Sequence, residues 1–282
     1  MRARAPASSA NLGPGYDALG LALSLHLEVT VEPASRLEVS AEGEGADLVG
    51  GDHLALRVVR QLLGHDSFAL HVASRIPLAR GLGSSAALAA AAAAAAGAED
   101  PLAVAAAVDG HAENAAASVL GGLVAATLVG GRPLCRELPL DPGLAFVVVV
   151  PDRPLPTAEA RAVLPATVPL EDATHNLGRL ALLLAGLADR HYLVAEAGED
   201  RLHQPWRTAL FPEAPELLAR LRRAGAAVAT WSGAGPSLLA ICQERSLAPG
   251  VARAGEEALD SLELAGEVLV LEPDLDGIVV AG

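Results

Sequence analysis

A glycine-rich turn that leads into a run of alanines constrains this chain more than any other feature. Residues 76–87 read IPLARGLGSSAA, and a stretch dominated by alanine follows. Alanine is the strongest helix former, whereas Gly81 and Gly83 permit positive φ angles and close backbone approach. A helix that begins here leaves backbone N–H groups unpaired and carries partial positive charge, which together can bind phosphate without a basic side chain. The segment predicts either a phosphate cradle or an ordinary strand-to-helix turn with a serine N-cap.

The basic residues narrow the choice of chemistry, because all 20 of them are arginine and the chain has no lysine. A Walker-type loop, a protein kinase and a Schiff-base enzyme each need a lysine amine, so these classes are excluded. An anion site in this chain must therefore depend on backbone dipoles, a metal ion and arginine.

Composition also limits the number of domains, the possible partners and the location of the protein. With 282 residues the chain is long enough for two ordinary domains, and its formal charge of −14 argues against nucleic acid or an anionic membrane as a partner. Two cysteines make neither a disulfide framework nor a zinc site, and residues 1–6 lack the apolar stretch of a signal peptide. The apolar run at 86–98 is too short to span a membrane, so we expect a soluble, cytoplasmic protein.

Hydrophobic patterning and turn residues predict an α+β chain with a domain boundary close to residue 143. The first domain, 1–143, is expected to contain antiparallel strands at 25–31 and 36–41 and further strands at 68–74 and 123–129. Its helices are expected at 52–63, 84–96 and 102–109, and a loop is expected at 110–114. The second, 144–282, is expected to be a compact layer with strands at 144–150, 227–231, 237–242 and 267–271 and helices at 173–187 and 213–224.

A second glycine cluster, SGAGPS at 232–237, lies between two of the expected strands. It is either a hairpin turn or a place where another stretch of backbone passes close by.

Three motifs occur in the order and spacing of one superfamily: PASSANLGPGYD at 6–17, GLGSS at 81–85 and SGAGPS at 232–237. The chain resembles a GHMP kinase. The first motif and the HAEN segment at 111–114 are similar to those of the homoserine kinases in that superfamily. The resemblance implies an N-terminal domain like domain 2 of ribosomal protein S5, a C-terminal ferredoxin-like domain, and a cleft where ATP and substrate meet. It also implies phosphorylation of the side-chain hydroxyl of L-homoserine to O-phospho-L-homoserine, in threonine biosynthesis, and a possible homodimer.

The resemblance carries over to individual positions that would bind ATP and Mg²⁺. The triphosphate would be wrapped by Pro77, Leu78, Ala79, Arg80, Gly81, Leu82, Gly83, Ser84, Ser85, Ala86 and Ala87. Ser85 and Asp109 would contact the metal. The family has glutamate where this chain has Asp109, and the shorter side chain makes water-mediated coordination possible because magnesium keeps part of its hydration shell.

The acceptor implied by the resemblance is a small zwitterion, which needs an acid near its ammonium and arginines near its carboxylate. By similarity, Asp17 takes the first role, Arg179 and Arg207 take the second, and Asn11, His111 and Asn114 hydrogen-bond the acceptor or order the loop beside it.

No catalytic base is evident, because Asn114 stands where mevalonate-type relatives carry aspartate and there is no lysine to pair with it. His111 has a suitable pKa range for a base, but a role in ordering the loop is favoured. The resulting hypothesis is catalysis by positioning and electrostatic stabilisation, with Asn114, Ser85 and Asp109 as the catalytic groups.

Two alternatives stay open at this point. One is a sister kinase acting on mevalonate or a sugar, and the other is a regulator that binds nucleotide without turnover, for which Asp109 in place of glutamate is the only sign.

Overall fold

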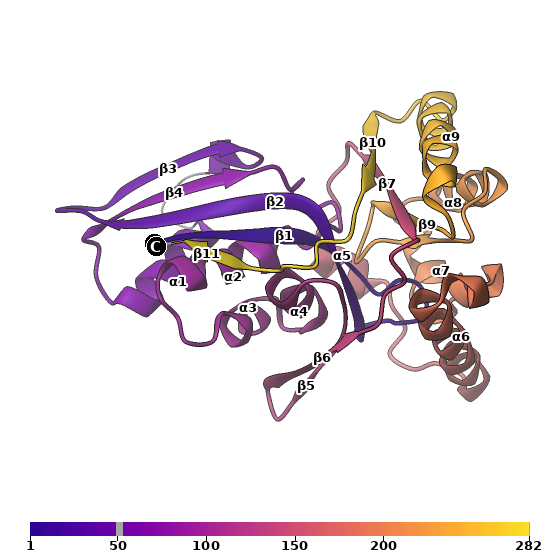
Figure 1. The fold of residues 1–282 in the computed structure, drawn as a ribbon, viewed down its shortest axis with the longest axis horizontal. Coiled ribbons are helices and arrows are strands. Elements are labelled where there is room, and N and C mark those ends of the chain that lie inside the picture. The colour runs from indigo at the N-terminus through magenta and orange to yellow at the C-terminus, as the bar shows by residue number, and fades with distance from the viewer. Residues whose placement is uncertain (49–52, 282) are drawn as a thin grey trace.

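The computed structural model describes residues 1–48 and 53–281, which form two β-sheets with helices packed against them (Figure 1). The first sheet contains β1 (Arg2–Ala10), β2 (Leu19–Pro33), β3 (Glu38–Gly43), β4 (Phe68–Ser74), β5 (Leu123–Val129), β6 (Arg132–Leu138) and β11 (Val279–Ala281). Its order is β11-β1-β2-β4-β3, and β5 pairs with both β2 and β6. Every second residue of β4 is buried, as expected for a strand with one face on the core.

Four helices lie on one face of this sheet: α1 (Leu54–Leu63), α2 (Ser84–Ala95), α3 (Pro101–Asp109) and α4 (Glu113–Leu120) (Figure 1). A short 3₁₀ turn, η1 (Ala46–Leu48), precedes α1. The alanines of α2 are buried, because α2 packs against β1 and β2 and also against α1, α3 and α4. Alanine side chains let several elements approach α2 closely, so the alanine run encodes a central helix.

The second sheet contains β7 (Ala145–Pro151), β8 (Val228–Trp231), β9 (Leu238–Cys242) and β10 (Gly266–Leu271) in the order β10-β7-β9-β8, with all pairs antiparallel. Its main helices are α6 (Leu170–Ala188), α8 (Ala214–Arg223) and α9 (Ala248–Ser261). The shorter elements are α5 (Thr157–Ala162), η2 (Arg190–Tyr192), η3 (Ala195–Gly198), α7 (Gln204–Arg207) and η4 (Arg245–Leu247). The succession β7, helices, β8, β9, α9, β10 is that of a ferredoxin-like domain, which confirms the expected fold class.

All seven residues of β7 are buried, and the reason is that both faces of the strand are covered. Val147 and Val149 join a core cluster with Leu217 and Leu221 of α8, whereas Phe146 and Val148 join the larger cluster that includes α6 and the first sheet. A strand that is covered on both faces usually has a continuous run of apolar residues, and β7 has such a run.

Several predicted elements agree with the structure, and others need correction. The strands expected at 68–74 and 123–129 coincide with β4 and β5. The expected loop at 110–114 was wrong in its second part, because α4 begins at Glu113. Its N-cap is Ala112, and no side chain of the described residues caps it, so the usual start signal is absent. The expected antiparallel strand at 36–41 is β3, at 38–43, and it pairs in parallel with β4.

Other differences concern the ends of predicted elements and the helices and strands that the sequence did not predict. The helix expected at 52–63 is α1 from Leu54 onward, and Asp52 lies outside the described residues. The sequence patterns did not indicate β1, β6, β11, α5, α7 or α9. None of the helices within 1–48 and 53–281 combines the length and apolarity needed to cross a membrane.

The C-terminal segment returns to the first sheet. Strand β11 pairs with β1, with Arg4 opposite Val279, and the Asp274 carboxylate lies 2.6 Å from His26 Nε2 and accepts a hydrogen bond from the Gly277 N–H. The division between residues 143 and 144 stays a prediction, with the added finding that residues 279–281 pair with the N-terminal strand.

Candidate active site

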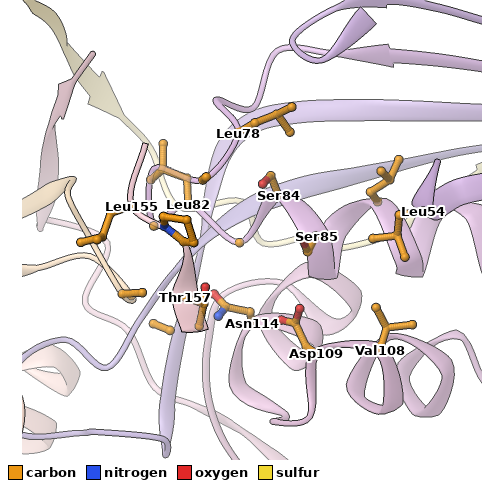
Figure 2. A pocket seen from close by; sticks show the side chains of 18 of the residues that line it. Leu54, Leu78, Leu82, Ser84, Ser85, Val108, Asp109, Asn114, Leu155 and Thr157 are labelled. Carbon is orange, nitrogen blue, oxygen red and sulfur yellow. The ribbon is translucent and has the colours of Figure 1, made fainter. Parts of the chain in front are cut away.

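A cavity of about 570 Å³ is lined by residues from both halves of the chain. Figure 2 shows its wall, with Ser84 and Ser85 on α2, Asp109 at the end of α3, Asn114 on α4 and Thr157 on α5. Charged groups in the lining include Asp17, Asp109, Glu113, Arg161 and Arg207. The cavity therefore combines a helix start with a cluster of acids and arginines.

The glycine-rich turn ends at the first turn of α2, as the sequence predicted. Gly83 is the N-cap residue with φ 65°, and none of the described side chains caps the helix. The serine N-cap considered from the sequence is therefore not formed, and the hydroxyls of Ser84 and Ser85 line the cavity instead. The N–H groups of the first helical turn are free to bind an anion.

The three sequence motifs meet at this turn. The Ser8 N–H donates to Leu82 O (3.0 Å), the Ser232 hydroxyl donates to Gly81 O (2.7 Å), and the Gly233 N–H donates to Ala10 O (2.9 Å). A Cβ on Gly81 would lie 2.2 Å from the Ser232 carbonyl oxygen. The second glycine cluster is a turn between β8 and β9 and also the site of close approach, so both interpretations offered from the sequence apply.

Only some of the residues that were predicted to bind the triphosphate line the cavity. Leu78, Ala79, Gly81, Leu82, Gly83, Ser84 and Ser85 line the cavity. Ala86 and Ala87 are buried in the core, and the Arg80 guanidinium pairs with Asp152 (2.6 Å). Pro77 precedes the lining residues and is not itself among them.

Asp109, a predicted metal-contacting residue, lines the cavity with Ser85. Burial raises the pKa of its carboxyl to about 6, the nearby Glu113 adds to this, and His111 and Arg161 oppose it. Among the residues that the structure describes, no three His, Cys, Asp or Glu side chains gather into a metal-binding group. Ser85 and Asp109 would give a cation two oxygen ligands, which suits an ion that keeps water and phosphate in its shell.

The predicted ammonium-binding residue, Asp17, forms a bidentate ion pair with Arg161. Arg161 Nη2 donates to Asp17 Oδ1 (2.6 Å) and Nη1 donates to Oδ2 (3.1 Å). The Arg161 guanidinium also donates to the Tyr16 hydroxyl (3.0 Å). Sequence reasoning missed Arg161, because it lies on the six-residue helix α5, which had no periodic signal.

The other predicted substrate residues have internal partners. Arg207 is 2% exposed and donates to Gly233 O (2.7 Å) and His203 Nδ1 (2.9 Å), although it still lines the cavity. Asn11 uses both ends of its amide, donating to Gly233 O and accepting from the Asp17 N–H. Arg179 lies on α6 outside the cavity lining, where its Nε donates to Glu199 (2.9 Å).

The segment from His111 to Asn114 places three polar side chains in the cavity wall. Asn114 Oδ1 accepts from the Ser8 hydroxyl (2.9 Å), and His111 Nδ1 lies 3.4 Å from Glu113 Oε1 and 3.7 Å from Asp109 Oδ2. Burial raises the pKa of Glu113 to about 7. Sequence reasoning did not single out Glu113, and its only signal was its position beside Asn114.

Comparisons with known proteins identify the family. The GHMP kinases N-terminal domain model matches residues 47–131, and the GHMP kinases C-terminal model matches 173–261. A homoserine kinase from Moorella thermoacetica is 39% identical over 98% of each chain, and one from Thermus thermophilus is 44% identical over 90% of this chain and 87% of that protein.

Solved structures agree with these matches. The crystal structure of a homoserine kinase from Cytophaga hutchinsonii superimposes with a TM-score of 0.86 at 25% identity, covering 100% of this chain and 97% of that one. A mevalonate kinase from L. major, at 14% identity and a TM-score of 0.71 over 98% of this chain and 95% of that one, shares the fold. The chain therefore belongs to the GHMP kinase family and, within it, groups with the homoserine kinases.

Proposed function

We propose that this protein transfers the γ-phosphoryl group of ATP to the side-chain hydroxyl of L-homoserine, giving O-phospho-L-homoserine for threonine biosynthesis. One observation carries the proposal. An uncapped helix start and a set of acids and arginines suited to a zwitterion line the same cavity, in a chain similar over almost its full length to proteins named homoserine kinase.

The nucleotide would occupy the part of the cavity between α1 and the phosphate-binding turn. Leu54 and Val108 give this region apolar walls that suit a purine base, and Leu88 also lines the cavity. The backbone amides near Gly81 and Gly83 would hold the terminal phosphates. Mg²⁺ would be held by Ser85 and Asp109 and would neutralise phosphate charge.

The acceptor would lie between α5 and the start of α4. Arg161 and Arg207 offer guanidinium groups for its carboxylate, and Arg179 stays a predicted substrate residue although α6 holds it outside the lining. Asn114 is oriented by Ser8, so its amide N–H group can donate to the substrate hydroxyl or to the transferred phosphate.

These residues accelerate transfer by positioning and by stabilising charge. The hydroxyl proton would leave to phosphate or solvent, which a loose phosphoryl-transfer transition state permits. The homodimer and the cytoplasmic location stay predictions.

An enzyme-coupled assay of ADP release with L-homoserine, mevalonate and galactose in parallel tests the proposal. We expect ADP release with L-homoserine only. Release with mevalonate or galactose instead would support the sister kinase, and ATP binding without release for any substrate would support the non-catalytic regulator.

A further inference from the structure

Tyr16 is not among the described residues that line the cavity, but its ring contacts Arg161 and Arg207, which do line it. The guanidinium carbon of Arg161 is 5.7 Å from the centre of the Tyr16 ring, and that of Arg207 is 5.8 Å from it. Both distances are within the roughly 6 Å over which the face of an aromatic ring attracts a cation. The Tyr16 hydroxyl also accepts a hydrogen bond from Arg161 Nη1 (3.0 Å). One side chain therefore contacts both arginines of the acceptor site.

Two guanidinium groups next to the same ring repel each other, so their charges need compensation. Asp17 compensates Arg161, because both of its carboxylate oxygens accept hydrogen bonds from that side chain. Arg207 is buried, and the hydrogen bonds that it donates within the described residues go to uncharged acceptors, which are Ala160 O, Gly233 O and His203 Nδ1. Burial lowers the pKa of Arg207, and the positive charge of Arg161 adds to the decrease. The electron-rich face of the Tyr16 ring partly offsets both charges.

His203 fixes the position of the Tyr16 ring. The two rings are stacked, with their centroids 5.1 Å apart and their planes at 28° to each other. His203 Nε2 donates to Gly13 O (2.8 Å), and Nδ1 accepts from Arg207 Nη1 (2.9 Å), so the imidazole is neutral with its proton on Nε2. Burial lowers the pKa of His203 to about 4, in agreement with a neutral ring. His203 therefore supports the Tyr16 ring without adding a third positive charge.

We propose that Tyr16 is a positioning residue that holds the guanidinium groups of Arg161 and Arg207 together, so that both can bind the α-carboxylate of the substrate. This inference rests on the proposed function, because it assumes that homoserine occupies the cavity. The ring carries most of the effect, because it contacts both arginines, whereas the hydroxyl hydrogen-bonds to only one of the two.

The test compares L-homoserine with L-homoserine amide, which keeps the hydroxyl and the ammonium but has an uncharged carboxamide. Tyr16→Leu removes the ring, and Tyr16→Phe keeps the ring without the hydroxyl. Tyr192→Leu is the control, because it makes the same change at an exposed position. Steady-state kinetics gives kcat and KM for each substrate and KM for ATP. Calorimetric titration of both compounds adds a binding measurement that does not need turnover. Thermal melts show whether each variant folds, and Tyr16→Met replaces Tyr16→Leu if that variant does not.

We expect Tyr16→Leu to raise KM for L-homoserine about 10-fold or more, as for loss of cation–π contacts to two desolvated guanidinium groups, with kcat and KM for ATP unchanged. KM for L-homoserine amide should change by less than about 2-fold, because the amide lacks the charge that the arginines bind. Tyr16→Phe should raise KM for L-homoserine by less than about 5-fold, because only one hydrogen bond is lost. The control should behave as the unmodified protein.

Two results would overturn the inference. One is that Tyr16→Leu weakens both substrates by the same factor or neither of them, because a purely structural role makes no distinction between a carboxylate and an amide. The other is that Tyr16→Phe loses as much as Tyr16→Leu, because the ring would then contribute nothing. If the unmodified protein neither binds nor phosphorylates L-homoserine, the proposed function itself fails, and this outcome is distinguishable from the other two.

Discussion

Replacing Gly81 by alanine tests whether the glycine-rich turn before α2, the proposed phosphate site, depends on close contact between the two halves of the chain. Gly81 has φ 76°, and an added Cβ would lie 2.2 Å from Ser232 O and 2.8 Å from Gly235 N. Both are backbone atoms, so they cannot rotate away as a side chain could. The turn or the β8–β9 connection must therefore move.

The expected loss of stability has three parts. A left-handed conformation costs an alanine about 1–2 kcal/mol. Forcing packed groups apart costs about 1–3 kcal/mol. Loss of the hydrogen bond from the Ser232 hydroxyl to Gly81 O costs about 1 kcal/mol. We therefore expect the free energy of unfolding to fall by about 3–6 kcal/mol, which corresponds to a drop in Tm of about 6–24 °C.

Gly64→Ala is the matched control. Gly64 ends α1 with φ 71°, but no described atom lies within 4 Å of a Cβ built there. Only the conformational cost applies, about 1–2 kcal/mol, so Tm should fall by about 2–8 °C. Scanning calorimetry gives both melting temperatures, and steady-state kinetics gives KM for ATP, which should rise in Gly81→Ala alone. Equal losses of Tm in the two variants, or an unchanged KM for ATP in Gly81→Ala, would refute the reasoning.

Four further predictions concern the charged groups. Asp109→Asn should raise the Mg²⁺ concentration for half-maximal activity about 10-fold or more, and an unchanged Mg²⁺ titration would remove Asp109 from the metal site. Arg161→Met should raise KM for L-homoserine at least about 10-fold with KM for ATP unaltered, whereas equal increases would contradict a carboxylate-binding role. Burial raises the pKa of Glu113 to about 7, so its neutral form stabilises the ligand-free fold below pH 4.5 and that stability is lost as pH rises through 7. Thermal melts from pH 4.5 to 8 should therefore show the unmodified protein losing up to about 3 kcal/mol relative to Glu113→Gln, and parallel curves would contradict this. Burial tends to raise the pKa of Asp274, but hydrogen bonds from His26, Gly277 and Asp276 lower it overall. Asp274→Asn should therefore destabilise the fold by about 1–3 kcal/mol at pH 7, with a difference that shrinks as pH falls below about 4, and a pH-independent difference in urea unfolding would argue against an ionic contribution.

Comparison of individual elements shows which features are encoded locally. Strands β4 and β5 coincide with their predicted ranges, because alternation and β-branched residues report the environment of the strand itself. The positive φ angles at Gly81 and Gly83 were also expected, because glycine adopts them at little cost. In contrast, α4 has no capping side chain among the described residues, and tertiary packing of its alanines stabilises it.

The candidate site likewise has residues that the local sequence positions and residues that contacts between distant segments position. Ser84 and Ser85, which are close in sequence to the glycine-rich turn, line the cavity because the turn and the helix start position them directly, and their role as triphosphate ligands stays a prediction. The acceptor residues depend on contacts between distant segments. Arg161 reaches Asp17 across 144 positions of sequence, and Ser8 reaches Asn114 across 106.

By itself, the sequence determined the glycine-rich turn at the start of a helix, the aliphatic core, the absence of lysine chemistry and the family resemblance, because all of these depend on residue identity and local conformation. Only the tertiary structure decided that Arg161 rather than Arg179 lines the cavity, that Asp17 is paired, and that Glu113 is buried with one oxygen that no group in the described part of the chain hydrogen-bonds. The physical reason is that burial and ion pairing arise from the packing of segments far apart in the chain, which local propensity does not describe.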